Sequence, residues 1–176
     1  MGEVIKNDVP ALARWVAAQK IGLIVFDGFP GAGKTTLAKD LAGRLRCRTV
    51  DADLFLEKKR DMFVEALRLP ELAAEIRIAM ELSRFVLFSS TCAREVTDRI
   101  GFEAKAFVYV LLVTPEGEVN EKYALQAEDE FDLAELEGEG LSPLDIEVRK
   151  YHWNRKPRRT ADVIYERTDE YVLPPL

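Results

Sequence analysis

The chain has 176 residues, of which 48% are hydrophobic and 32% are charged, and its formal net charge is −6. This length and composition suit one domain with a proper core, over residues 1–176. With two cysteines and one histidine, the chain lacks the residues for a disulfide framework or a zinc site.

No stretch is typical of a membrane span or a secretory signal. The longest apolar run, Ala106–Val113, is too short to cross a bilayer, and the first residues carry acidic side chains. We therefore expect a cytoplasmic protein without a membrane partner, acting as a monomer or homodimer. The segment 115–140 has ten acidic residues and one lysine, which argues against nucleic acid as a partner at that face.

The first predicted elements are a helix, a strand and a second helix. Val9–Lys20 has Pro10 near its start and apolar residues at helical spacing. Ile21–Asp27 is apolar almost throughout, as a parallel strand buried on both faces should be. Thr35–Leu45 carries leucines on one stripe and charges elsewhere, which predicts an amphipathic helix.

A phosphate-binding loop of the Walker A form, Gly28-x-x-x-x-Gly33-Lys34-Thr35, joins this strand to the second helix. Its glycines allow a tight turn whose amides point at phosphate oxygens, and the helix N-terminus adds positive partial charge. Lys34 is expected to reach the β- and γ-phosphates, and the Thr35 hydroxyl to bind Mg²⁺. The predicted nucleotide-binding residues of the loop are Gly28, Gly31, Ala32, Gly33, Lys34, Thr35 and Thr36.

The middle of the chain continues the alternation of apolar strands and helices. Pro70 is expected to separate two helices, and Gly101 to end a third. In order, we predict a strand at Arg48–Asp51, helices over about 56–69 and 71–82, a strand at Phe85–Ser89, a helix at Thr91–Ile100 and a strand at Ala106–Val113.

The last third of the chain begins with an acidic segment of weak periodicity, at about 114–140, which predicts a loop or a lid-like insertion. Ser142 followed by Pro143 predicts a helix start, and the helix should run to about His152. A basic loop and a fifth strand, Ala161–Glu166, follow. Such regular alternation predicts an α/β fold of three layers, with a parallel sheet between two layers of helices.

Ligands of parallel sheets bind at the carboxyl ends of the strands, where the phosphate-binding loop, Asp51–Asp53 and Ser89–Arg94 all fall. A phosphoryl acceptor needs its proton received, and Mg²⁺ needs acidic ligands reached through water. Asp53 is therefore a candidate catalytic residue facing the acceptor, and Asp51 a candidate for the metal. Alternatively, either aspartate caps the next helix.

Two segments, GFPGAGKTTLAKDLA and VDADLFLEKKR, resemble the P-loop kinases of the nucleoside and nucleotide kinase-like superfamily. The second is similar to the D-x-D of shikimate and gluconate kinase-like enzymes and to the D-x-F-Y of uridine kinase-like enzymes, with Asp53-Leu54-Phe55 at those places. The resemblance is specific over about residues 21–60. It implies ATP and Mg²⁺ as ligands, Asp53 as the base, a five-stranded sheet of order 2-3-1-4-5 and a mobile lid after strand four.

The third strand departs from these families. It ends in FSSTCAR, without the Walker B aspartate that many P-loop NTPases use for Mg²⁺ and without the Gly-Gly-Gly turn of shikimate kinases, which argues against shikimate as the acceptor. Ser89, Ser90 or a water held by Asp51 would complete the metal shell. Arg94 pairs either with an acceptor or a phosphate, or is a solvated helix arginine.

A kinase also needs cations that neutralise charge on the transferred phosphoryl group. The predicted lid is acidic, and the basic residues follow it. Arg155 is the first candidate for this catalytic role, and Arg158 the second, as a nucleotide-binding residue. Alternatively, the basic residues form a solvated face that neutralises the acidic segment, and His152 is expected to be a packed side chain.

The leading hypothesis is an ATP-dependent kinase that transfers the γ-phosphoryl group of MgATP to a small metabolite, such as a nucleoside or a nucleotide. No Asn/Thr-Lys-x-Asp signature follows strand four, which favours ATP over GTP. A polynucleotide 5′-hydroxyl kinase is one alternative, against which the net acidity argues. A regulatory nucleotide-binding module with little turnover is the other, favoured by the missing strand-three aspartate and the acidic lid.

Overall fold

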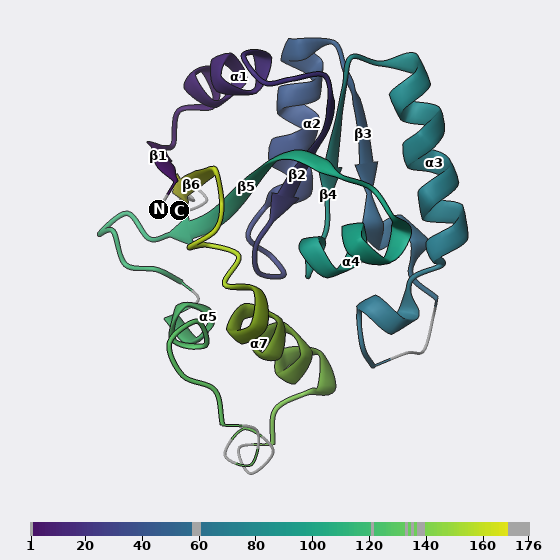
Figure 1. The fold of residues 1–176 in the computed structure, drawn as a ribbon. Helices are drawn as coiled ribbons and strands as arrows, with labels where there is room; N and C mark the ends of the chain where they lie inside the picture. The colour runs from purple at the N-terminus through teal and green to yellow at the C-terminus, as the bar shows by residue number, and fades with distance from the viewer. Residues whose placement is uncertain are drawn as a thin grey trace, which may run out of the picture.

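Six parallel strands form the centre of the structure, a computed structural model that describes residues 2–57, 61–120, 122–132, 134, 136 and 140–168. The strand order is β1-β6-β5-β2-β4-β3 (Figure 1). The strands are β1 Glu3–Lys6, β2 Gly22–Asp27, β3 Arg48–Asp51, β4 Phe85–Ser89, β5 Ala104–Val113 and β6 Val163–Thr168.

Helices cover both faces of this sheet, so the predicted three-layer α/β class is confirmed (Figure 1). Leu12, Leu37 and Leu41 pack on one face and Leu72 and Ile76 on the other, and each set joins a separate core cluster. The helices are α1 Val9–Ala17, α2 Lys34–Leu45, α3 Leu69–Leu82, α4 Ala93–Ile100, α5 Lys122–Gln126 and α7 Pro143–Arg155, with 3₁₀ turns η1 Ala52–Phe55 and η2 Val64–Ala66.

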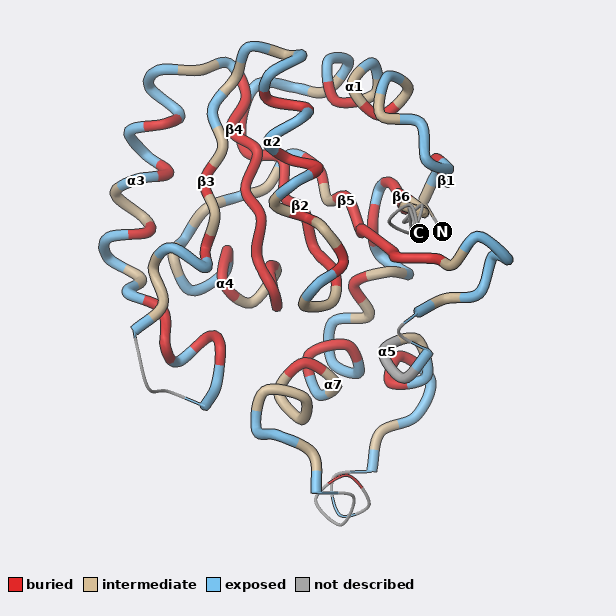
Figure 2. Tube along the Cα trace, turned by 180° about the vertical axis from the view of Figure 1, so that it is seen from behind, coloured by how far each residue is buried: buried red, intermediate tan, exposed pale blue. Residues whose placement is uncertain are grey.

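The central strands are buried on both faces, which explains their continuous apolar sequence (Figure 2). The five expected strands have the predicted order, but the expected number of five is wrong. The sixth strand, β1, pairs with β6 at the sheet edge, and Ile5 is its one buried residue. A four-residue strand with one buried side chain offers no periodic pattern, so the sequence could not predict it.

The predicted helix over 56–69 is wrong. Among the described residues of this stretch, Leu56 and Leu67 form an antiparallel bridge, and Glu57 N donates to the carbonyl of Ala66 at 2.7 Å. These pairings fold the stretch back on itself between η1 and η2, which a helix would not allow. Pro70 does not break a helix either, because it lies in the first turn of α3, where proline is favoured.

The acidic segment after β5 includes the short helix α5, which the sequence did not predict. Ser142 caps α7 as expected, and Asp145 completes a capping box that holds the first turn. Helices α5 and α7 lie together beyond the carboxyl ends of the strands (Figure 1). A lid role for 114–140 stays a prediction, and no helix in the described part of the chain has the length and apolar character to cross a membrane.

His152 is a buried side chain on α7, as expected, with 1% of its surface exposed. Its Nδ1 lies 2.7 Å from the carbonyl of Val148 and its Nε2 lies 2.9 Å from the Tyr109 hydroxyl. Since a carbonyl only accepts, Nδ1–H donates to it and Nε2 accepts from Tyr109. Burial lowers the pKa of His152, and the hydrogen bond to Val148 and the charge of Asp27 oppose that shift.

A depressed histidine pKa predicts acid sensitivity of the fold. The unfolded chain takes up the proton near pH 6.5 and the folded chain only below it, so stability should fall as pH drops below about 6.5. Urea unfolding at pH 7.5, 6.5 and 5.5 measures this slope. His152→Gln should flatten the slope over that interval, and an unchanged slope in this variant would contradict the assignment.

Candidate active site

The phosphate-binding loop joins β2 to α2 and is built on three glycines with positive φ, Gly28 (142°), Gly31 (82°) and Gly33 (84°). Helix α2 begins directly after it, at Lys34. The Lys34 ammonium donates to the carbonyls of Gly28 (2.9 Å) and Phe29 (2.6 Å), so the side chain curls over its own loop. Burial lowers the pKa of Lys34, and the nearby carboxylates of Asp27, Asp53 and Asp51 oppose that shift.

Gly28 cannot be replaced without disturbing the sheet. A Cβ atom there would lie 2.5 Å from the Val110 carbonyl oxygen of β5, and the φ of 142° is strained for any L side chain. Gly28→Ala should lower the free energy of unfolding by about 2 kcal/mol, since backbone strain and overpacking add. Gly43→Ala in α2 is the matched control, because nothing lies within 4 Å of its added Cβ.

Chemical denaturation of the two variants measures the difference in their free energies of unfolding. The thermal shift on adding MgATP measures whether the loop still binds the nucleotide. We expect Gly43→Ala to match or exceed the wild-type stability, because alanine favours helices. Equal stability of both variants would contradict the close approach of Gly28 to β5.

A cavity of about 360 Å³ opens at the carboxyl ends of β2, β3 and β4. It brings together seven of the predicted site residues from two separate segments of the chain: Lys34, Thr35, Asp51 and Asp53, and also Gly31, Gly33 and Thr36 of the loop. The remaining lining residues are Pro30, Leu56, Phe63, Ser89, Ser90, Thr91 and Leu144.

Asp51 and Asp53 share the edge of this cavity in different roles. Asp51 caps η1, because its Oδ1 accepts from Asp53 N at 3.2 Å, so the capping alternative holds for Asp51 while it still lines the cavity. Asp53 has an exposed side, yet partial burial raises the pKa of its carboxyl, Asp51 adds to the shift and Lys34 opposes it. A raised pKa brings a carboxylate closer to the range in which it accepts protons at neutral pH.

Thr35 and Ser89 meet where a magnesium ion would be bound. Their hydroxyl oxygens lie 3.3 Å apart, and Asp51 lines the same cavity. Mg²⁺ prefers oxygen ligands and is usually held by one or two carboxylates together with substrate phosphates. The three side chains fit that preference. Ser89 occupies the end of β4, where a Walker B aspartate is missing.

Asp27 is a buried carboxylate beneath the loop that the sequence analysis did not identify. It is 2% exposed; one of its oxygens accepts from Gly28 N at 2.8 Å, and the other accepts from the hydroxyl of Tyr151 on α7. Burial and the adjacent Asp27 charge raise the pKa of Tyr151, which stays a proton donor. A charge at the end of an otherwise apolar strand was the available signal.

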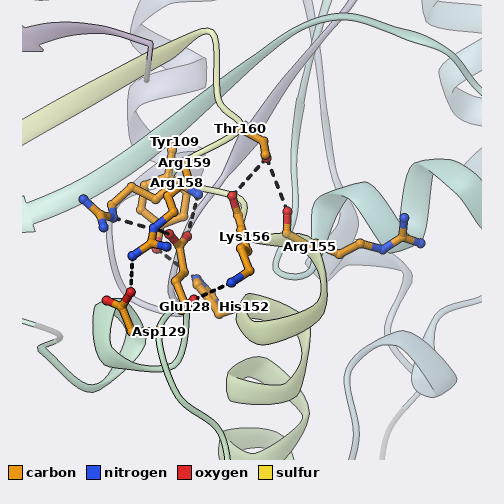
Figure 3. Close-up of polar contacts among 9 residues, drawn as sticks. All are labelled: Tyr109, Glu128, Asp129, His152, Arg155, Lys156, Arg158, Arg159 and Thr160. Atoms are coloured by element: carbon orange, nitrogen blue, oxygen red, sulfur yellow. Dashed lines mark hydrogen bonds and ion pairs between the residues drawn. The ribbon is translucent and has the colours of Figure 1, made fainter.

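The two predicted arginines do not line the cavity. Arg155 is exposed at the end of α7 and pairs with Asp98 of α4 at 2.7 Å. Arg158 belongs to a cluster of ion pairs and hydrogen bonds between the basic loop that follows α7 and the acidic segment 114–140 (Figure 3). For Arg158 this arrangement corresponds to the alternative in which basic residues neutralise the acidic segment, whereas the partner of Arg155 lies outside that segment.

Glu128 is the centre of that cluster and is fully buried (Figure 3). Its Oε1 accepts from Arg158 N at 2.8 Å, its Oε2 lies 3.4 Å from Arg159 Nε, and its carbonyl accepts from Lys156 Nζ at 2.9 Å. Burial raises the pKa of Glu128, and Arg158 and Arg159 oppose the shift. Asp129 adds an ion pair with Arg159.

Arg167 of β6 was also missed, and it lies over the phosphate-binding loop. A Cβ atom on Gly33 would overlap its guanidinium. Arg167 also lines a hollow of about 160 Å³ with Thr36 and Asp40, beside the cavity described above. It is therefore the arginine that the structure brings to the loop, in place of the two that the sequence favoured.

Comparison with known proteins agrees with this architecture. The family model of shikimate kinase matches residues 30–67, which include part of the loop and both aspartates. No curated protein sequence matches the chain. A possible uridine kinase from Bacillus stearothermophilus has a similar structure, with 14% identity and a TM-score of 0.52 over 89% of this chain and 96% of that one.

The shikimate kinase of Aquifex aeolicus is also similar, with 17% identity and a TM-score of 0.42 over 82% of this chain and 85% of that one. The resemblance to the P-loop kinase-like superfamily is confirmed at the level of its fold, without a specific family. The fold and the family model support a P-loop kinase in general terms. The roles of the individual site residues stay predictions.

Proposed function

We propose that the chain transfers the γ-phosphoryl group of MgATP to a hydroxyl group of a small-molecule acceptor. The observation that carries the proposal is the single cavity lined by Lys34 of the loop and by Asp53, a carboxylate of raised pKa. A phosphate-binding cation and a proton acceptor on one cavity suit phosphoryl transfer better than nucleotide binding alone.

In the proposed reaction, the loop amides and Lys34 hold the β- and γ-phosphates. Asp53 orients the acceptor hydroxyl and receives its proton while a bond forms between the acceptor oxygen and the γ-phosphorus. The bond from that phosphorus to the β,γ-bridging oxygen breaks, and ADP leaves. Thr35, Ser89 and Asp51 would hold Mg²⁺, which neutralises phosphate charge when bound.

The hollow beside Thr36, with Asp40 and Arg167, is the place we propose for the nucleoside end of ATP, because Thr36 lines both spaces. Arg167 then supplies the charge that the sequence led us to expect from Arg155 or Arg158. We further propose that the protein acts in the cytoplasm, as a monomer or homodimer, in keeping with its composition.

The test is a transfer assay with γ-labelled ATP, Mg²⁺ and a panel of nucleosides, nucleotides, sugars and hydroxy acids, including uridine and shikimate. We expect label in one acceptor class and ADP formation that depends on that acceptor, with both abolished by EDTA. Tight MgATP binding with no acceptor-dependent ADP formation would contradict the proposal and favour a regulatory module. Label in a single-stranded oligonucleotide alone would favour a polynucleotide kinase.

A further inference from the structure

The part of the cavity that would hold the phosphoryl acceptor is rich in hydrogen-bond acceptors and poor in cations. Beyond the loop it presents the carboxylates of Asp51 and Asp53 and an apolar wall of Leu56, Phe63 and Leu144. Of the described residues that line the cavity, Lys34 alone is a cation, and it serves the loop. An acceptor with its own negative charge would therefore face two carboxylates without a counter-charge from these residues.

Two hydroxyl side chains at the end of β4, those of Ser89 and Ser90, are engaged within the protein. Ser90 Oγ donates to the carbonyl of Thr91 at 2.7 Å, and its backbone N–H donates to Phe26 O at 3.2 Å. Ser89 Oγ is engaged with Thr35. Beside the Thr91 hydroxyl, the polar side chains that remain beyond the loop are the carboxylates of Asp51 and Asp53, so a ligand that fits them brings its own donors, as hydroxyl groups do.

A pair of backbone amides near the cavity could have held an anion, but the chain fills it with its own carboxylate. Phe63 N donates to Glu147 Oε2 at 2.5 Å, and Val64 N donates to Glu147 Oε1 at 3.0 Å. Converging amides of this kind are a common binding place for phosphate and carboxylate groups. Glu147 occupies it from α7, so these amides are not open to an anionic acceptor, and the carboxylate bonds to the backbone of Phe63, a residue that lines the cavity.

The two arginines of α4, Arg94 and Arg99, have partners elsewhere. Arg94 of α4 donates to the carbonyl of Thr160 at 2.8 Å and lies over the Phe107 ring, 3.7 Å from its centroid. Arg99 pairs with Glu65 at 2.8 Å and with Glu95 at 3.1 Å. The prediction that Arg94 pairs with an acceptor therefore has no support in this arrangement.

From these observations we infer that the acceptor is an uncharged polyhydroxylated molecule with an apolar face, such as a nucleoside or a polyol, and not a phosphate monoester or a carboxylic acid. The inference rests on the proposed function. It specifies the acceptor class for the same site: the hydroxyl donors meet Asp51 and Asp53, and the apolar face packs on Phe63 and Leu144.

Pairs of acceptors test the inference, because one member of each pair carries a phosphate or a carboxylate where the other carries a hydroxyl group. We would compare cytidine with CMP and glucitol with gluconate, measuring kcat/KM for ADP formation and binding in the presence of a non-hydrolysable ATP analogue. The uncharged member of at least one pair should be preferred by about tenfold or more. MgATP affinity, measured separately, distinguishes a failed inference from a failed proposal of kinase function.

Glu147→Gln provides a second, independent readout. Removing this charge should narrow the preference for the uncharged member by about threefold, because repulsion of an anion falls. Glu75→Gln on the exposed face of α3 is the matched control and should leave the preference unchanged. A structural role of Glu147 would lower activity with both members alike and leave their ratio unchanged, which would contradict its part in selection.

Three results would overturn the inference. One is equal use of both members, and another is binding of no uncharged member by a protein that binds MgATP. The third is a preference for the anion that is lost in the combined variant Lys58→Ala, Lys59→Ala and Arg60→Ala. That result would assign acceptor binding to the basic run 58–60, which lies outside the described residues.

Discussion

Asp53→Asn is expected to lower kcat for phosphoryl transfer by about 10²–10⁴-fold while the affinity for MgATP changes by less than about threefold. Asparagine keeps the shape of the side chain, and the backbone N–H of residue 53 can still donate to Asp51, which caps η1. The amide of asparagine cannot receive a proton as the carboxylate does. Because burial and Asp51 raise the pKa of Asp53, the acid limb of the wild-type pH profile of kcat/KM should lie above the usual range for aspartate. That limb should disappear in the variant.

Steady-state kinetics with the preferred acceptor and titration with a fluorescent ATP analogue measure the two quantities separately. Asp98→Asn, on the exposed surface of α4 and outside the cavity, is the control for loss of a carboxylate. If Asp53→Asn weakens MgATP binding as strongly as it slows transfer, the carboxylate serves the metal or the fold, and its assignment as base is wrong.

Lys34→Met is expected to lower kcat by about 10²–10³-fold and to weaken MgATP binding as well, because one preorganised charge on the transferred group is lost. The variant should not be less stable than the wild type without nucleotide. Methionine fills similar space. Burial disfavours the charged form of Lys34, as its lowered pKa shows, so replacing the ammonium removes this cost to the free energy of folding.

Lys39→Met is the control. It removes a positive charge from the same helix, α2, but at an exposed position away from the loop, so it separates the effect of charge at the loop from the effect of charge on the helix. Thermal unfolding with and without MgATP gives both stabilities in one experiment. Retention of the full MgATP-induced shift in Lys34→Met would show that the lysine does not contact the phosphates.

The loop and the five expected strands could be predicted because their signals are local. Gly28, Gly33 and Lys34 lie within seven residues of sequence, and each buried strand has its own apolar run. The prediction of a helix over 56–69 was wrong because the decisive signal is not local: the backbone pairs Leu56 with Leu67, while the apolar spacing resembles that of a helix. Short apolar patterns do not separate these two cases.

The missed parts of the site depend on contacts between distant residues. Tyr151 reaches Asp27 across 124 positions of sequence, and Glu147 reaches Phe63 across 84. No pattern in a single sequence records such a pairing. The position of Arg155 depends on such a contact as well, because its basic neighbourhood was visible in the sequence whereas its partner Asp98, on another helix, was not.

The pairing of β1 with β6 has a consequence for folding. Glu3 is in register with Val163, so the first strand can join the sheet only after nearly the whole chain is available. Closing so long a loop is slow, and β2, β3, β4 and β5 should assemble before β6 and β1 join them. Arg167 is carried by β6, the partner of β1, and lies against Gly33, so the loop should acquire its final electrostatic surroundings only late in folding.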